Sequence, residues 1–114
     1  MTTRKDVIDH CLTYNNAYED YPFDDPNWTV MRRRDTNKGF AWIFERQGNI
    51  WVNIKVDPFM AYDLREAFPS IVPAYHMNKV HWCSVILDGT VPEDIIESLI
   101  GESYRLCGKK GALT

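Results

Sequence analysis

The stretch Pro73-Ala74-Tyr75-His76-Met77-Asn78-Lys79-Val80-His81-Trp82 decides how the rest of the sequence is interpreted. It gathers two imidazoles, an amine, an amide, a phenol and an indole in one short window. A predicted helix ends before it at Pro69, and an apolar run at 85–87, typical of a strand, follows it. We therefore expect a polar connection between two regular elements, where functional groups often occur. The alternative, slightly favoured by residue chemistry alone, is that its polar groups cap neighbouring elements and its rings close the edge of the core.

The elements beside this central loop carry clear boundary signals. Asp57-Pro58 combines a good helix cap with a proline suited to the first turn, so a helix is expected to begin there. A strand is predicted over 82–87, followed by a turn. The residues from Thr90 to Glu93 form a capping-box pattern for a last helix that runs to about Cys107.

The first half of the chain is predicted to hold a helix, an acidic loop and three strands. These are expected, in that order, at residues 3–14, 15–27, 28–34, 40–46 and 49–56. The third strand alternates apolar and polar residues, as a half-buried strand does. The whole order is α-β-β-β-α-β-α. It predicts the α+β class, with a single antiparallel sheet and helices packed on one face.

The turn Gln47-Gly48 fixes the expected register of the second and third strands. A two-residue hairpin loop at this point places Phe44 opposite Trp51. One face then carries the aliphatic residues Ala41, Ile43, Ile50, Val52 and Ile54, and the other carries Phe40, Trp42, Phe44 and Trp51 with Arg46, Asn53 and Lys55 around them. This second face is either an aromatic platform with a basic rim, which stacks bases, or a surface covered by a helix or another strand. Coverage is favoured, because monomers rarely expose large aromatic patches.

Length and composition limit the function classes. The 114 residues predict a single domain over 1–114, and we expect a monomer. The net charge of −3 argues against bulk electrostatic affinity for nucleic acid or anionic membrane. Three widely spaced cysteines favour a reducing compartment, and the sequence shows neither a signal-peptide pattern nor an apolar run of membrane-spanning length. We therefore expect a cytoplasmic protein without membrane partners.

Three stretches carry a family resemblance. They are Ala17-Tyr18-Glu19-Asp20-Tyr21-Pro22-Phe23, Lys55-Val56-Asp57-Pro58 and the central motif Pro-Ala-Tyr-His-Met-Asn-Lys-x-His-Trp. Together they make the chain resemble the MmcQ/YjbR-like family of small bacterial proteins over nearly its whole length. The resemblance implies a fold like that of the bacterial frataxin homologue CyaY and a DNA-binding role in a double-wing arrangement. The chain departs from the family at Cys83, where Asn is expected, and in the longer and more basic segment 32–39.

Two functions are carried forward from the sequence. The first is binding of double-stranded DNA, through a basic hairpin and a central loop whose candidate residues are Arg32, Arg33, Arg34, Lys38, His76, Asn78, Lys79 and His81. The alternative is a module that binds a protein or a small ligand, without nucleic acid. Its candidate pocket at the central loop consists of Tyr75, His76, Asn78, His81 and Trp82.

Catalytic and metal chemistry receive weaker support. His81 and Cys83 would share a face of a regular strand, but a buried inert cysteine is the simpler interpretation. The four carboxylates of the acidic loop lack the spacing of a calcium-binding loop. The first helix offers only Asp6 and Asp9 for frataxin-type iron binding, next to Arg4 and Lys5. No catalytic residue, metal ligand or cofactor is therefore assigned.

Overall fold

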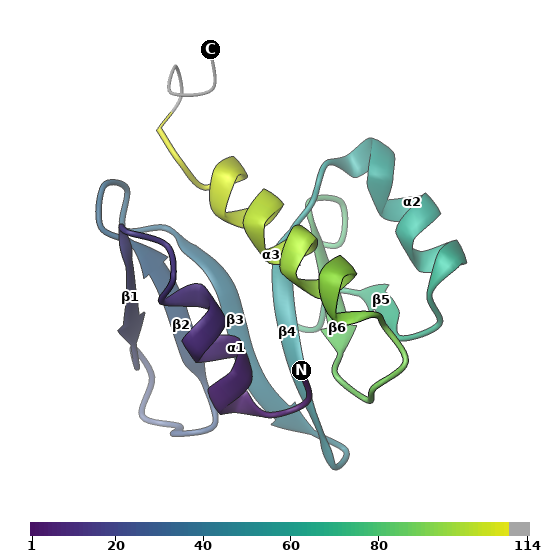
Figure 1. Ribbon diagram of the computed structural model, residues 1–114, viewed down its shortest axis with the longest axis horizontal. Coiled ribbons are helices and arrows are strands. Elements are labelled where there is room, and N and C mark those ends of the chain that lie inside the picture. Colours follow the sequence, from purple (N-terminus) through teal and green to yellow (C-terminus); the bar gives the residue numbers. More distant parts are fainter. Residues whose placement is uncertain (110–114) are drawn as a thin grey trace.

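A six-stranded antiparallel sheet forms the centre of the computed structural model, which describes residues 1–109 (Figure 1). The strand order across the sheet is β1-β2-β3-β4-β6-β5. The helices are α1 (Arg4–Cys11), α2 (Pro58–Ala67) and α3 (Glu93–Leu106). The strands are β1 (Ala17–Asp20), β2 (Thr29–Arg33), β3 (Gly39–Arg46), β4 (Asn49–Lys55), β5 (Ile71–Pro73) and β6 (Trp82–Ile86). The predicted α+β class and the order of the predicted elements are confirmed.

Two strands at the edges of the sheet were not predicted. The prediction of loop over 15–27 is wrong for Ala17–Asp20, which pair with β2 as strand β1. Ile71–Pro73, just before the central loop, pair with β6 as strand β5. Both are short strands that complete the two edges of the sheet.

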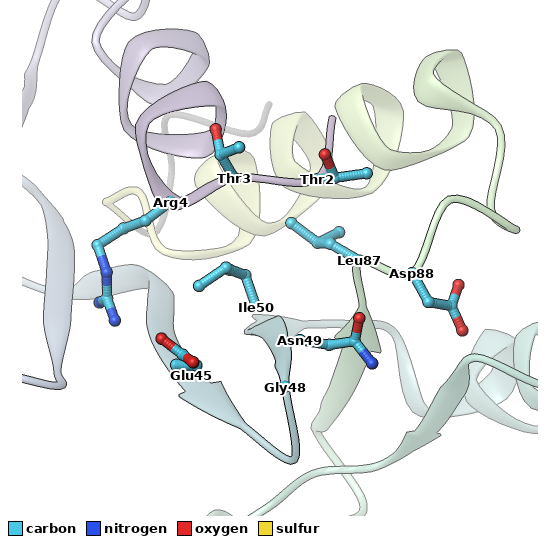
Figure 2. A pocket seen from close by; sticks show the side chains of 9 residues that line it. All are labelled: Thr2, Thr3, Arg4, Glu45, Gly48, Asn49, Ile50, Leu87 and Asp88. Carbon is cyan, nitrogen blue, oxygen red and sulfur yellow. The ribbon is translucent and has the colours of Figure 1, made fainter.

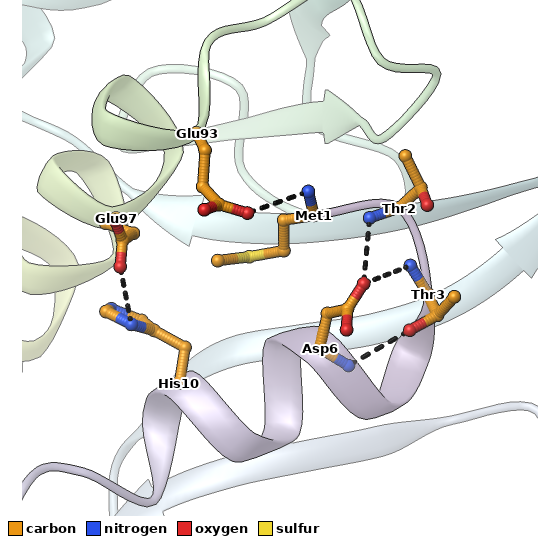
Figure 3. Close-up of polar contacts among 7 residues, drawn as sticks. All are labelled: Met1, Thr2, Thr3, Asp6, His10, Glu93 and Glu97. Atoms are coloured by element: carbon orange, nitrogen blue, oxygen red, sulfur yellow. Dashed lines mark hydrogen bonds and ion pairs between the residues drawn. The ribbon is translucent and has the colours of Figure 1, made fainter.

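The helix starts follow local chemistry, with one exception. The Thr3 hydroxyl accepts the Asp6 N–H, and the Asp6 carboxylate accepts the Thr3 N–H, so α1 begins with the predicted capping box (Figure 3). Asp57 caps α2 by accepting the N–H of the residue at position 59. The predicted capping box of the last helix is wrong, because Pro92 is the cap residue and makes no side-chain cap bond. Thr90 instead donates its hydroxyl to Asp88, one turn before the helix.

The predicted β3–β4 register is confirmed. Phe44 pairs with Trp51, and the turn residues Gln47 and Gly48 have φ values of 53° and 81°. Positive φ at both positions is the backbone that a tight hairpin turn requires.

The placement of Phe40 on the aromatic face is wrong. Met31 pairs with Ala41 and Arg32 with Gly39, so Phe40 is an extra residue in a β-bulge. The bulge directs its ring to the helix side, where it packs edge-on against Tyr104 at 5.1 Å between ring centroids.

All three helices contribute to one core cluster on one side of the sheet. In Figure 1, α1 and α3 lie on the same side of the sheet, and both contact β3, while α2 packs beside β5. The cluster contains Val7 and Cys11 from α1, Ala61 from α2 and Ile96 and Ile100 from α3. Against them lie the inward residues of the central strands, including Ala41, Ile43, Val52, Ile54, Cys83 and Val85.

Polar contacts join the start of the chain to α3 (Figure 3). The Met1 amino group bonds to the Glu93 carboxylate at 3.0 Å. His10 Nδ1 lies 3.2 Å from the Glu97 carboxylate. These contacts close the helix layer over the core.

Candidate functional site

The opposite face of the sheet is covered by loops rather than by a helix of the described chain. Its central ring is Phe44, which is 1% exposed because Trp28 stacks on it at 4.5 Å and Tyr75 at 5.5 Å between centroids. Trp51 packs beside both Phe44 and Tyr75. Apart from Phe40 the expected aromatic face therefore exists, and its centre is covered, although by loops rather than by the expected helix or strand.

An open groove remains where the covering loops meet. A hollow of about 390 Å³ is lined by Phe23, Asp25, Trp28, Trp42, His76 and Met77. A second hollow of about 200 Å³ shares Asp25, Trp28 and His76 with it and extends to Arg46 and Tyr75. We call the two together the aromatic groove. Phe23 is 49% exposed, while Trp28 and Trp42 are half-buried, so the rings of the larger hollow are held by packing and still reach solvent.

The central loop is anchored to the sheet beneath it by a buried polar node. The Asn53 side-chain amide, which is 0% exposed, donates to the Tyr75 carbonyl at 2.8 Å. The Tyr75 N–H donates to the Ser84 hydroxyl at 2.9 Å, and Ser84 bonds in turn to Asn53. His76 then takes φ 60°, a left-handed conformation that turns the chain sharply. Its ring lies 4.0 Å from the Tyr75 ring, at the edge of the groove.

Charged groups around the groove are largely paired or stacked. Arg32 lies over the Trp42 ring at 5.7 Å and bonds to the Asp20 carboxylate at 2.7 Å. Arg46 lies over the Tyr75 ring at 4.5 Å. One oxygen of Asp25 accepts the Asn27 N–H at 2.9 Å, which fixes this carboxylate at the groove.

The basic residues of the predicted hairpin wing do not form one surface. Arg32 lies over Trp42, a lining residue of the groove, whereas Arg33 lies over the Tyr104 ring of α3 at 4.0 Å and donates to the Tyr104 carbonyl. Arg33 also makes a two-pronged contact with Asp35, and this bond holds the pKa of the Asp35 carboxyl below its ordinary value. Arg34 and Lys38 are exposed.

Most of the other candidate residues of the central loop serve the loop itself. The Asn78 side chain accepts the N–H groups of residues 80 and 81, and Lys79 donates to the Ala74 carbonyl at 2.9 Å. His81 is exposed, and Trp82 is half-buried against the core cluster. Of the ligand pocket predicted from Tyr75, His76, Asn78, His81 and Trp82, the structure brings Tyr75 and His76 into the groove.

Cys83 has the surroundings of a structural thiol. It is 0% exposed, and burial raises its pKa above the ordinary value, although a bond from Arg65 at 3.8 Å acts in the opposite direction. His81 lies outside β6, so the predicted shared strand face of these two residues is not formed. Within residues 1–109, no group of three or more His, Cys, Asp or Glu side chains is arranged to hold a metal ion.

A larger hollow lies elsewhere, between the start of the chain and the β3–β4 turn. It measures about 510 Å³, and Figure 2 shows Thr2 and Thr3 on one side and Glu45 and Asn49 on the other. Its Arg4 side chain is committed to the Asn27 carbonyl at 2.8 Å and to other groups of the fold. Because the Arg4 guanidinium bonds to groups of the fold, it is not available to a ligand in this hollow.

Comparison with known proteins identifies the family of this chain. The family model YjbR matches residues 12–106, which include every strand of the sheet and the whole aromatic groove. The chain belongs to the YjbR family. None of the helices in the described part of this YjbR-family protein is long and apolar enough to cross a membrane.

Relatives and solved structures agree with this membership. The uncharacterized protein YyaQ of Bacillus subtilis is 32% identical over 117 residues, covering 93% of this chain and 98% of that protein. The uncharacterized protein YjbR of Escherichia coli K12 is 28% identical, covering 90% and 85%. The crystal structure of Deinococcus radiodurans protein DR2400 has a TM-score of 0.87 at 38% identity, covering 97% of this chain and 82% of that one. A Pseudomonas syringae crystal structure has a TM-score of 0.83 at 31% identity, covering 93% and 99%.

Several groove residues of this YjbR-family chain were not singled out from the sequence. Phe23 and Asp25 come from a segment that was interpreted as an acidic loop, Trp28 was predicted as the first residue of a strand, and Met77 lies within the central motif. The available signal was the presence of three aromatic residues, Tyr21, Phe23 and Trp28, beside the carboxylates of 19–25. Sequence alone did not show that this loop folds back over the β3–β4 hairpin.

Proposed function

We propose that this YjbR-family protein is a binding module that takes a small ligand in the aromatic groove. The observation that carries the proposal is a hollow of about 390 Å³, lined by two half-buried indoles, on the sheet face that loops cover. Ligand sites are typically concave, rich in aromatic side chains and supplied with a few fixed polar groups. Asp25 and His76 are such groups at this groove.

The charges near the groove favour a small ligand over a polyanion. Arg32 is neutralised by Asp20, and Asp25 lies in the groove itself. A nucleic acid backbone needs several uncompensated cations along its path, since each phosphate contact is made locally. The groove presents one such cation, Arg46, which is stacked on Tyr75, together with the Asp25 carboxylate.

A chemical-shift titration of labelled protein with a panel of small aromatic, cationic and neutral compounds tests the proposal. We expect at least one compound to shift the indole N–H signals of Trp28 and Trp42 in a saturable way. Trp28→Ala should abolish that response. Tyr62→Ala, which removes an exposed ring on α2, 64% exposed and outside the groove, should leave it unchanged. A panel without any saturable shift at groove residues would contradict the proposal.

Binding of double-stranded DNA is the second candidate. The observation that favours it is the hairpin tip, where Arg34 and Lys38 are exposed and appear in no ion pair among residues 1–109. Exposed arginine and lysine are the side chains that contact phosphates. A duplex titration at low and at physiological salt tests this function. Arg34→Ala combined with Lys38→Ala should weaken binding and flatten its salt dependence, whereas the absence of shifts at low salt would exclude it.

A further inference from the structure

We propose that the ligand of the aromatic groove is an organic cation, a small molecule that carries an alkylated ammonium group. This inference rests on the proposed function, because it names the chemical class that the same groove would take. Three kinds of observation carry it: the inclination of the ring planes, the cations that this face already holds, and the position of one carboxylate.

The rings of the larger hollow are inclined to each other by different angles. Phe23 lies edge-on to Trp28, with 6.2 Å between centroids and 77° between planes, and it lies at 34° to Trp42. Trp28 is held in place by stacking on Phe44. Three aromatic rings that line one hollow at different inclinations are surroundings that attract an alkylated ammonium.

Other rings on this face already hold cations of the protein itself. The Arg32 guanidinium lies over Trp42, and the Arg46 guanidinium lies 4.9 Å from the Trp51 ring centroid and 4.5 Å from that of Tyr75. Guanidinium–ring contacts therefore recur across this part of the sheet. Phe23 and Trp28 hold no such cation among the described residues, which leaves their rings for a ligand.

Asp25 supplies the counter-charge. It lines both hollows, and its bond from the Asn27 N–H fixes one oxygen while the second makes no bond within residues 1–109. The two nearby arginines that would repel a positive ligand are either paired with a carboxylate or located outside the larger hollow. Arg32 is paired with Asp20, and Arg46 lines the smaller hollow but not the larger one. The larger hollow, beside Trp28 and Trp42, is therefore the place for the ammonium group.

A matched pair of probes separates cation recognition from simple ring burial. Choline carries a trimethylammonium group, and dimethylbutanol is the neutral alcohol in which carbon replaces the choline nitrogen. Each probe is titrated into labelled protein, and the Trp28 and Trp42 indole N–H signals are followed. We expect choline to bind about tenfold more tightly than its isostere, since ring faces and a carboxylate both favour the charge.

Two variants locate the source of that preference. Asp25→Asn keeps the acceptor for the Asn27 N–H and removes the charge, so it should reduce the preference for choline to about twofold or less and leave the isostere unchanged. Asp24→Asn is the matched control, because its carboxylate is exposed and does not line either hollow. It should keep the full preference.

The outcomes distinguish this inference from the function on which it rests. Equal binding of the two probes, or tighter binding of the isostere, overturns cation recognition and leaves the groove as a ligand site. Binding of a neutral panel compound when choline causes no shift overturns it as well. If neither the probes nor any panel compound shifts the groove signals, the proposed function fails with it.

Discussion

At the scale of single residues, Asn53 links the sheet to the candidate site. Its side chain is completely buried and is bonded to the Tyr75 carbonyl and to Ser84. A buried amide is stable when its bonds are made, and its removal leaves the former partners without theirs. The position of Tyr75, and with it the edge of the groove, therefore depends on one strand residue that does not touch the groove.

We expect Asn53→Ala to lower the free energy of unfolding by about 2–4 kcal/mol, through lost hydrogen bonds and a small cavity. Chemical denaturation measures this change. Asn49→Ala, on the same strand but at the open turn, is the control and should change stability by no more than about 0.5 kcal/mol. A loss for Asn53→Ala as small as that of the control would show that Tyr75 is held by ring packing alone.

Arg33 shows why residue type alone did not identify the basic surface. Its side chain is 12% exposed and is used for Asp35 and for the ring and carbonyl of Tyr104. We expect Arg33→Ala to destabilise the protein by about 1–2 kcal/mol, because charge-assisted bonds and a cation–ring contact are lost together. Lys38→Ala is the control, because its side chain is exposed and makes no ion pair or ring contact among residues 1–109, and it should be neutral within about 0.5 kcal/mol. Thermal unfolding of the two variants compares them, and equal effects would contradict a structural role for Arg33.

At the scale of elements, short sequence patterns predicted the features that depend on neighbouring residues, such as turns and the register they set. The Gln47-Gly48 turn fixed the pairing of Phe44 with Trp51 because turn geometry and register are coupled. Strand β1, Ala-Tyr-Glu-Asp, could not be recognised in this way, since Glu and Asp are poor strand formers and its pairing with β2 comes from the tertiary fold. The bulge that turns Phe40 inward is likewise a property of two paired strands. Packing of the 21–28 loop over the hairpin is non-local too. For that reason the sequence predicted the central-loop side of the groove but not the side that the 21–28 loop supplies.

The turn after β6 should make stability depend on acid. Asp88 accepts hydroxyl bonds from Ser70 at 2.5 Å and from Thr90 at 2.6 Å, and these bonds hold its pKa below the ordinary value of 3.8. A carboxyl whose pKa is lower in the folded state stabilises the fold above the unfolded pKa, and this contribution is lost as the pH falls through the folded pKa. We expect Asp88→Asn to be less stable than the wild type near neutral pH and to approach the stability of the wild type as the pH falls below the ordinary carboxyl pKa.

Denaturation of both proteins across this acid range measures the difference. Thr90→Val, which removes one donor to Asp88, should show a smaller form of the same pH dependence. A difference between wild type and Asp88→Asn that stays constant from neutral to acid pH would contradict the linkage.

At the scale of the whole molecule, the sheet separates the hydrophobic core on one face from the candidate binding groove on the other. Helices α1, α2 and α3 share the core cluster on one face, while the loops on the other face leave an open groove. The three cysteines all lie in that core, and each is at most 1% exposed. Burial raises the pKa of Cys11 to about 12 and raises that of Cys83 and Cys107 as well. The thiols are therefore protonated and covered at neutral pH.

These thiols report how the molecule opens. Because the thiolate is the reactive form, Ellman's reagent should label the native protein at least about a thousandfold more slowly than the unfolded chain. Cys83 should react first. It lies in β6 beside the three-residue edge strand β5, which can separate locally, and the Arg65 bond favours its thiolate. Cys11, under the helix layer, should react at the rate of global unfolding. Timed labelling with peptide mass analysis gives the order, and equal rates at all three sites would show that β5 and β6 open only with the whole sheet.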